Sequence, residues 1–300
     1  MKSMILIVLM ICFSSIIFAE AGMSEAEAAY KKANYKVSFP IYKRLAETKD
    51  PDAMYKLGES FEEGRGVSVN LKQSYEWYKK ASELKNDWAM YKRALFAVSG
   101  KGTPLNYAEA SQWFKKSAKS GNMWAQYQLG MMADEGKGMP KDVIAAIDWY
   151  TLAADQGNNW AQYKLGEIYR QGNGVLVDID GAVSYYEKSV DQGNDWAAYQ
   201  LGGLYEEGKG ISQNFTKAAE MYEKAARAKN AWAQYKLALL YEKGNGVTKD
   251  YIQAWYWNNL GKNASFSGTK FSADLNARLS KVMTWDQTQK AKERIRNTKK

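Results

Sequence analysis

The chain has 300 residues, a length that favours several domains or a repeat array over one compact core. It contains 4 Pro but 21 Tyr and 11 Trp, which is typical of long helices with aromatic packing and excludes a mainly disordered chain. The formal net charge is +9, but residues 261–300 alone hold ten Lys/Arg against three Asp/Glu, so no basic footprint follows the whole chain and nucleic-acid binding is not expected.

The first 21 residues have the pattern of a secretory signal peptide. Lys2 provides the positive start, residues 4–18 are apolar, and an Ala-Glu-Ala sequence at 19–21 offers cleavage after either alanine. The apolar run is shorter than the roughly 20 residues that span a bilayer, so we expect a periplasmic or secreted protein without stable membrane insertion. An uncleaved anchor is the alternative. Cleavage would also remove Cys12, the only cysteine, so no disulfide is expected.

Residue columns with a spacing of 36 residues show that most of the chain is a repeat array. Each repeat has an Ala, a Tyr two residues later and then a Gly-x-Gly sequence. The Ala column comprises Ala53, Ala89, Ala125, Ala161, Ala197 and Ala233. We predict an all-α fold, a right-handed α/α superhelical solenoid of 36-residue helix-turn-helix repeats. The six predicted repeats are residues 52–87, 88–123, 124–159, 160–195, 196–231 and 232–260.

Each repeat is predicted to contain two helices, helix A before the Gly-x-Gly turn and helix B after it. In the third repeat, helix A covers residues 124–134 and helix B covers 143–155, where apolar residues recur at helical spacing. Asp50 precedes the first helix A and an Asn precedes the other five, and both residue types are favourable N-caps. Gly130 and its equivalents in helix A are expected to let the facing helix approach closely.

The two ends of the array are predicted to be caps. Residues 22–51 form a partial repeat with helices at 24–32 and 37–46. Residues 261–300 form a loop and two basic helices, and Thr284 with Gln287 makes a capping box for the second of them. We interpret the basic tail as solvated, with contact to anionic lipid or an acidic partner as the alternative.

The third repeat resembles the Sel-1-like repeat, a family related to tetratricopeptide repeats. The resemblance is carried by Ala-Gln-Tyr-Gln-Leu-Gly at 125–130, Gly-Lys-Gly at 136–138, Trp149-Tyr150 and Ala153-Ala154. It covers about residues 24–260. It implies an α/α superhelix that mediates protein–protein interaction and, for secreted bacterial members, a role in host contact or envelope complexes. Cysteine-rich relatives have been linked to β-lactam binding, but this chain lacks their cysteines.

Two aromatic columns on helix A are the predicted partner-binding groove. The resemblance to helical repeats that bind on the concave face of helix A places Trp124 and Tyr127 on that face, and residues three apart are neighbours on a helix. The predicted groove residues are Trp88, Trp124, Trp160, Trp196, Trp232, Tyr91, Tyr127, Tyr163, Tyr199 and Tyr235. The alternative is packing of repeat against repeat, which suits the Tyr column best.

Charged residues near these columns are interpreted as the rim of the groove, although charge on a helix surface is usually only solvated. They are Lys56, Lys92, Lys164, Lys236, Glu62, Asp134, Glu206 and Glu242.

The sequence argues against catalysis. It has no His, which removes the commonest general base and metal ligand, so no metal and no cofactor are expected. The Gly-x-Gly turns recur in every repeat without a preceding strand, which indicates turns rather than phosphate loops. We therefore expect a protein that is not an enzyme.

The predicted function is an exported scaffold that binds a protein partner through the Trp/Tyr-lined face of helices A. The partner could belong to the envelope, to a host or to a toxin-immunity pair. A glycan- or peptidoglycan-binding protein is the alternative, because Trp rings can stack on sugars. An enzyme of undetected type is the weakest hypothesis.

Overall fold

The computed structural model describes residues 22–260 and 269–298, and these are helical apart from turns and short loops, with no strand among them. The predicted signal peptide, residues 1–21, and most of the predicted loop after residue 260 lie outside the described residues. No described helix is long and apolar enough to cross a membrane.

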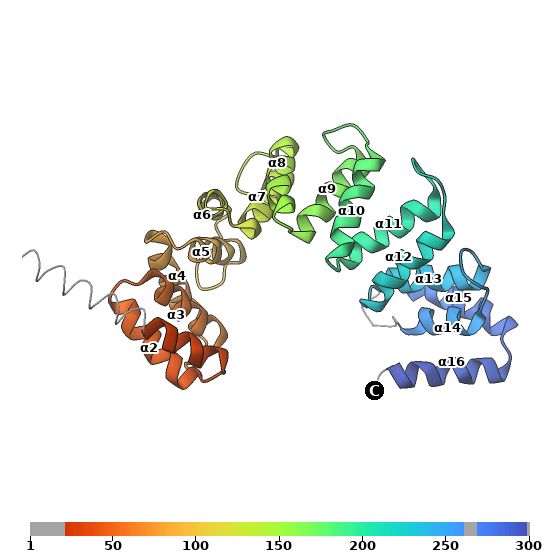
Figure 1. The fold of residues 1–300 in the computed structure, drawn as a ribbon, viewed down its shortest axis with the longest axis horizontal. Coiled ribbons are helices and arrows are strands. Elements are labelled where there is room, and N and C mark those ends of the chain that lie inside the picture. The colour runs from red at the N-terminus through yellow and green to blue at the C-terminus, as the bar shows by residue number, and fades with distance from the viewer. Residues whose placement is uncertain (1–21, 261–268, 299–300) are drawn as a thin grey trace, which may run out of the picture. The chain divides into compact units, whose positions relative to one another are not determined.

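Helices A and B alternate along the chain, as predicted (Figure 1). Helices A are α3 (Pro51–Glu63), α5 (Asp87–Ser99), α7 (Met123–Glu135), α9 (Asn159–Gln171), α11 (Asp195–Glu207) and α13 (Ala231–Lys243). Helices B are α2 (Tyr35–Glu47), α4 (Leu71–Glu83), α6 (Tyr107–Lys119), α8 (Val143–Asp155), α10 (Ile179–Asp191), α12 (Phe215–Arg227) and α14 (Tyr251–Leu260). The solenoid of helix-turn-helix repeats is thereby confirmed.

Side-chain caps set the start of the helices. Each helix A from α3 to α13 has the predicted Asp or Asn as its N-cap, and the cap oxygen accepts the backbone N–H three residues later. Helices B from α4 to α14 are capped in the same way, which the sequence analysis did not predict, whereas α2 has no side-chain cap. Their caps are Asn70, Asn106, Asp142, Asp178, Asn214 and Asp250.

The chain divides into two compact units, one ending at Leu152 and the other beginning at Ala153. In each unit, a helix packs against the helices before and after it in the chain, so helix A of one repeat lies between two helices B. The Ala column is fully buried and the Leu of helix A is nearly so, as in Leu57 and Leu201. The core of each unit is therefore a continuous strip along the stacked hairpins.

A ring from helix B sits directly on the glycine of helix A. In the third repeat, a Cβ at Gly130 would lie 2.5 Å from Cδ1 of Tyr150, a residue with no exposed surface. The predicted close approach of the two helices is confirmed.

A hydrogen-bonded triad links consecutive repeats inside each unit. In unit 1 the Tyr78 hydroxyl donates to Glu62 over 2.6 Å, and Lys92 of the next repeat donates to the same carboxylate over 2.9 Å. In unit 2 the corresponding distances to Glu206 are 2.6 Å from Tyr222 and 3.0 Å from Lys236. Four of the eight charged residues interpreted as a groove rim thus tie one repeat to the next, namely Glu62, Lys92, Glu206 and Lys236.

The third repeat has an incomplete version of this triad, and repairing it should stabilise the protein. Asp134 stands where the first, fifth and sixth repeats have Glu, and the buried Tyr150 hydroxyl makes no hydrogen bond within the described chain. Asp134→Glu adds the missing methylene, so we expect a gain of about 1 kcal/mol in the free energy of unfolding. Urea denaturation measures it. Tyr150→Phe should cancel the gain, and an equal gain in the Tyr150→Phe background would contradict the reason given.

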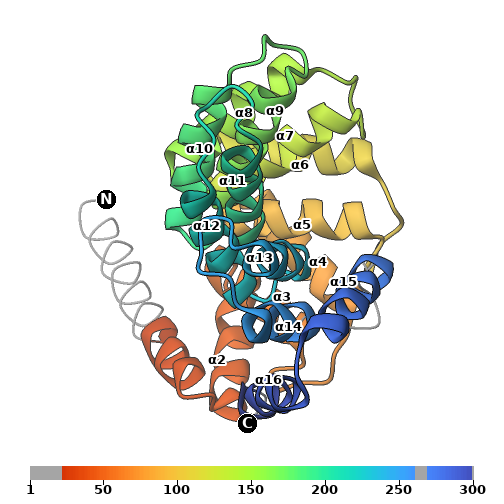
Figure 2. The ribbon, with the colours of Figure 1, turned by 90° about the vertical axis from the view of Figure 1, so that its right-hand side faces the viewer.

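The C-terminal cap comprises α15 (Thr269–Val282) and α16 (Trp285–Thr298). The predicted capping box is present, because Gln287 N–H donates to Thr284 Oγ1 over 3.2 Å and Thr284 N–H donates to the Gln287 side chain over 2.9 Å. Helix α15 packs against α13 and α14, while α16 packs along α14 (Figures 1 and 2).

Candidate partner-binding surfaces

The Trp column of helix A is the most exposed large aromatic feature among the repeats. Trp88, Trp160 and Trp196 have 43%, 38% and 40% of their surface exposed. Trp124 and Trp232 are partly buried. Each of the three exposed rings stands edge-on to the Tyr one turn later, with interplanar angles of 85°, 89° and 87°. The rings are thus fixed on one side and open on the other.

The Tyr column is more deeply placed. Each of its rings lies 5.8 to 6.2 Å from an aromatic ring of a following helix, between Tyr91 and Phe114 at one extreme and Tyr235 and Phe271 at the other. Burial raises the pKa of the Tyr91, Tyr163, Tyr199 and Tyr235 hydroxyls above the ordinary value. These tyrosines hold helix A against its neighbour and carry the tryptophans, so they form the base of the surface.

A pocket of about 370 Å³ lies on this face in unit 1, which we call the A-face pocket. Tyr55 and Trp88 supply its aromatic walls, and Met23 closes one side. Its charged lining comprises Glu27, Asp52, Lys56 and Asp87. The Lys56 ammonium forms an ion pair with Glu59 at 2.7 Å, so the remaining charge that the pocket presents to a ligand is mainly negative.

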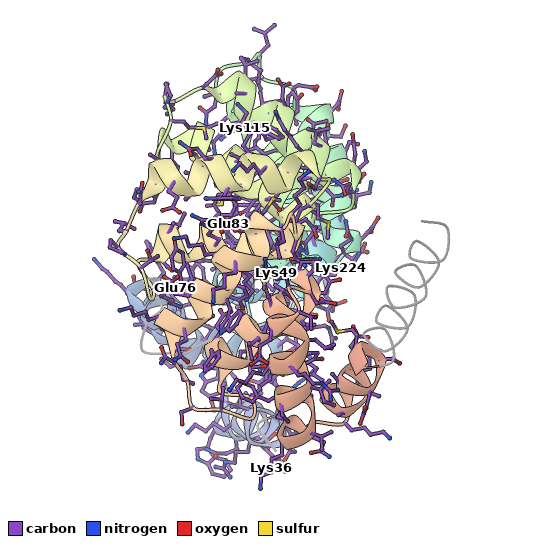
Figure 3. The ribbon with its side chains drawn as sticks, turned by 90° about the vertical axis from the view of Figure 1, so that its left-hand side faces the viewer. Lys36, Lys49, Glu76, Glu83, Lys115 and Lys224 are labelled. Carbon is purple, nitrogen blue, oxygen red and sulfur yellow. The ribbon has the colours of Figure 1, made fainter. Side chains whose placement is uncertain are left out.

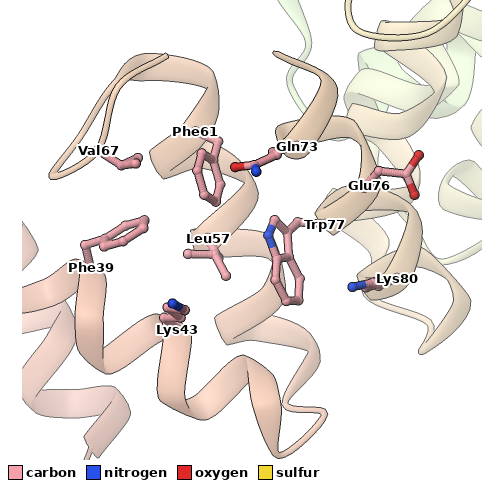
Figure 4. Close-up of a pocket in the computed structure, with 9 residues that line it drawn as sticks. All are labelled: Phe39, Lys43, Leu57, Phe61, Val67, Gln73, Glu76, Trp77 and Lys80. Atoms are coloured by element: carbon pink, nitrogen blue, oxygen red, sulfur yellow. The ribbon is translucent and has the colours of Figure 1, made fainter. Parts of the chain in front are cut away.

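The opposite face carries a second, larger cavity that the sequence analysis missed. A groove of about 560 Å³ runs between the helices B α2 and α4, over α3, and we call it the Trp77 groove (Figure 4). Its apolar floor consists of Phe39, Leu57, Phe61 and Trp77, and its polar lining includes Lys43, Gln73, Glu76 and Lys80. A cavity of about 260 Å³ lies at the equivalent place in unit 2, over Leu201 and Met221.

The first three helices B of unit 1, α2, α4 and α6, are basic. The sequences of α2, α4 and α6 hold nine Lys/Arg against four Asp/Glu, although the sequence analysis found residues before 261 nearly balanced overall. Lys36 on α2 and Lys115 on α6 are exposed on these helices (Figure 3). The charge is therefore separated by face in unit 1, with a mainly acidic A-face pocket and basic helices B.

Within residues 22–260 and 269–298, no three Asp or Glu side chains converge as a metal site would require.

Comparison with known proteins agrees with the helical architecture. The sequence matches the Sel1 repeat at residues 51–86, 89–122, 125–158, 161–194, 197–230 and 233–257. No protein of curated function matches significantly.

Two solved structures are similar over most of the chain. The Sel1 repeat protein from Oxalobacter formigenes has 31% identity and a TM-score of 0.75, and the match covers 81% of this chain and 100% of that one. A protective antigen of uropathogenic Escherichia coli strains, which has the SLR fold, has 26% identity and a TM-score of 0.58, and the match covers 91% of this chain and 67% of that one. Since the Sel1 repeat matches six successive segments that span most of the array, the chain belongs to the Sel1 repeat family.

Proposed function

We propose that the protein is a scaffold that binds segments of a protein partner through the exposed tryptophans of helices A, Trp88 in unit 1 and Trp160 and Trp196 in unit 2. Sel1 repeats are typical of protein–protein interaction, and the exposed tryptophans supply anchors of the kind that dominate such interfaces. The observation that carries the proposal is the exposure of Trp88, Trp160 and Trp196 on rings that are already held in place by tyrosines. A pre-positioned ring loses little entropy when a partner covers it.

The charge of the A-face pocket favours a peptide over a sugar. A neutral glycan would leave Glu27, Asp52 and Asp87 without a counter-charge, whereas a basic peptide side chain would supply one. Protein recognition is therefore the function we propose, and the signal-peptide pattern of residues 1–21 supports its placement in the periplasm or outside the cell.

The test is a comparison of single tryptophan variants. A partner captured from envelope extract by the purified protein is identified, and its dissociation constant is measured for the original chain and for Trp160→Ala. Removal of one anchor should cost about 2 kcal/mol, or roughly thirtyfold in affinity. Circular dichroism checks that the helices are retained.

Trp285→Ala is the matched control, because Trp285 on α16 is 77% exposed and lies outside the Trp column. It should leave the affinity unchanged. A partner that binds Trp160→Ala as tightly as the original chain would overturn the proposal. Capture of peptidoglycan instead of a protein would favour the glycan alternative.

A further inference from the structure

The Trp77 groove lies on the face opposite to the Trp column, between two helices B, and its floor is apolar. Phe39 of α2 and Phe61 of α3 meet edge to face, with ring centroids 5.7 Å apart, and Trp77 of α4 forms the far wall (Figure 4). The floor of the groove is therefore apolar.

The next repeat does not offer the same floor. Arg93 stands at the position of Leu57, and its guanidinium lies 4.1 Å from the centroid of Trp113, the equivalent of Trp77. Lys116 lies 3.6 Å from the same ring. Trp113 thus has both Arg93 and a lysine on its ring, whereas Trp77 has only the equivalent lysine, Lys80, and Leu57 in place of the arginine.

The same chain shows, in unit 2, what covers this face of a helix B. Tyr256 and Trp257 of α14 are the equivalents of Glu76 and Trp77, five repeats later. Both are only 6% exposed, and α16 packs along α14, where it contacts Tyr256 (Figure 2). The Tyr256 hydroxyl is 3.1 Å from Thr298 Oγ1, and Arg294 lies 4.7 Å from the Tyr256 ring centroid.

Helix α16 is amphipathic, and its apolar side faces the core. Its Ala291 is fully buried, and Ile295 packs against the core cluster that contains Trp257. In unit 2 an amphipathic helix therefore packs on a helix B, against Tyr256, whose equivalent Glu76 is one of the residues lining the Trp77 groove.

The charge of the Trp77 groove is opposite to that of the covered site. At the positions of Lys43 and Lys80, unit 2 has Glu223 and Leu260. The covered site accepts a basic helix, whereas the groove presents two lysines, with Lys80 Nζ 4.1 Å from the Trp77 ring centroid. The carboxylate of Glu76 points away from the three rings (Figure 4).

We propose that the Trp77 groove docks an acidic amphipathic helix of a partner protein, with apolar side chains on Phe39, Phe61 and Trp77 and carboxylates on Lys43 and Lys80. This is a helix-in-groove mode of recognition. It is independent of the Trp column and gives the scaffold a second binding face, so that one chain can hold two partners.

The test uses a peptide derived from α16, a helix that already packs on a helix B in this chain. The probe is a stapled helical peptide with the sequence of residues 285–298 in which Lys290→Glu and Arg294→Glu make the helix acidic. Its dissociation constant with the purified full chain is measured by fluorescence anisotropy. The acidic peptide should bind at least about tenfold more tightly than the unaltered basic peptide.

Three variants of the protein locate the site. Lys43→Glu with Lys80→Glu should weaken binding at least about tenfold. Trp77→Met should do the same, and it is expected to fold because the fifth repeat has Met221 at this position. The control is Lys115→Glu with Lys119→Glu, which makes the same charge change on exposed residues of α6 and should change the affinity less than about threefold.

Two results would overturn the proposal. Tighter binding of the basic peptide would indicate that the groove receives α16 of a second copy of this chain. An equal loss in the α6 control would indicate a diffuse basic surface of the kind that contacts an anionic membrane, which binding to vesicles containing phosphatidylserine would then measure.

Discussion

Gly102→Ala is expected to destabilise unit 1 by more than about 3 kcal/mol, as the sum of two costs. Gly102 has φ +66°, a left-handed conformation that costs an L-residue roughly 1–2 kcal/mol. A Cβ at this position would also lie 2.2 Å from the carbonyl oxygen of Leu71, at the start of helix B of the previous repeat. Because that neighbour is backbone, no side-chain rotation can relieve the collision, and the two repeats must separate.

Gly121→Ala separates these two costs. Gly121 has φ +93° but no neighbouring atom within 4 Å of a Cβ, so it retains only the conformational cost. Lys49, Lys85 and Lys229 occupy its column at φ +66°, +66° and +71°, which shows that side chains are tolerated there. Urea midpoints of both variants, followed by circular dichroism, provide the measurement. Equal losses would show that contact between repeats contributes nothing at Gly102.

The helix boundaries of this fold follow from local signals, which are visible in the sequence as residues that recur at the same position of each repeat. The third helix A was predicted at residues 124–134 and runs from Met123 to Glu135, because its Asn cap and its left-handed Gly136 are both encoded locally. The caps of helices B are equally visible as a column of Asn and Asp starting at Asn70. These recurring Asn and Asp residues are sufficient to predict where helices B begin.

The binding surfaces could be predicted only in part, since they depend on residues distant in the sequence. The sequence spacing of Lys92 and Glu62 suggests the rim of a groove. In the structure they form a hydrogen bond that joins two repeats, although they are 30 residues apart in the sequence. Trp77 and Trp257 occupy equivalent positions, yet Trp77 lines an open groove, whereas Trp257 is 6% exposed in a core cluster that includes residues of α15 and packs against Ile295 of α16. A repeat column predicts the place of a side chain in its repeat, but its exposure depends on the neighbour that covers it.

Gly202→Ala and Gly203→Ala, two changes at adjacent positions of α11, should have opposite effects. A Cβ at Gly202 would lie 2.7 Å from Cδ1 of the buried Tyr222, and overpacking of this kind costs up to about 3 kcal/mol. At Gly203 the nearest atom is the Tyr222 hydroxyl oxygen at 3.7 Å, an ordinary contact. At this position the substitution should therefore raise the free energy of unfolding by the full difference in helix propensity between Ala and Gly, roughly 1 kcal/mol. We therefore expect Gly202→Ala to lose about 2 kcal/mol and Gly203→Ala to gain about 1 kcal/mol.

The ring of Tyr222 cannot withdraw from the methyl group that Gly202→Ala adds, because the Tyr222 hydroxyl is held 2.6 Å from Glu206. The second repeat shows the alternative, since Ala94 there shares a core cluster with Phe114, and Val98 stands at the position of Glu206. Tyr222→Phe should therefore recover part of the loss in Gly202→Ala, so that the double variant is more stable than the sum of the single effects. Thermal and urea unfolding of the four chains form the double-mutant cycle. Strict additivity would mean that the hydroxyl anchor does not hold the ring, and that the backbone of α11 absorbs the added methyl group.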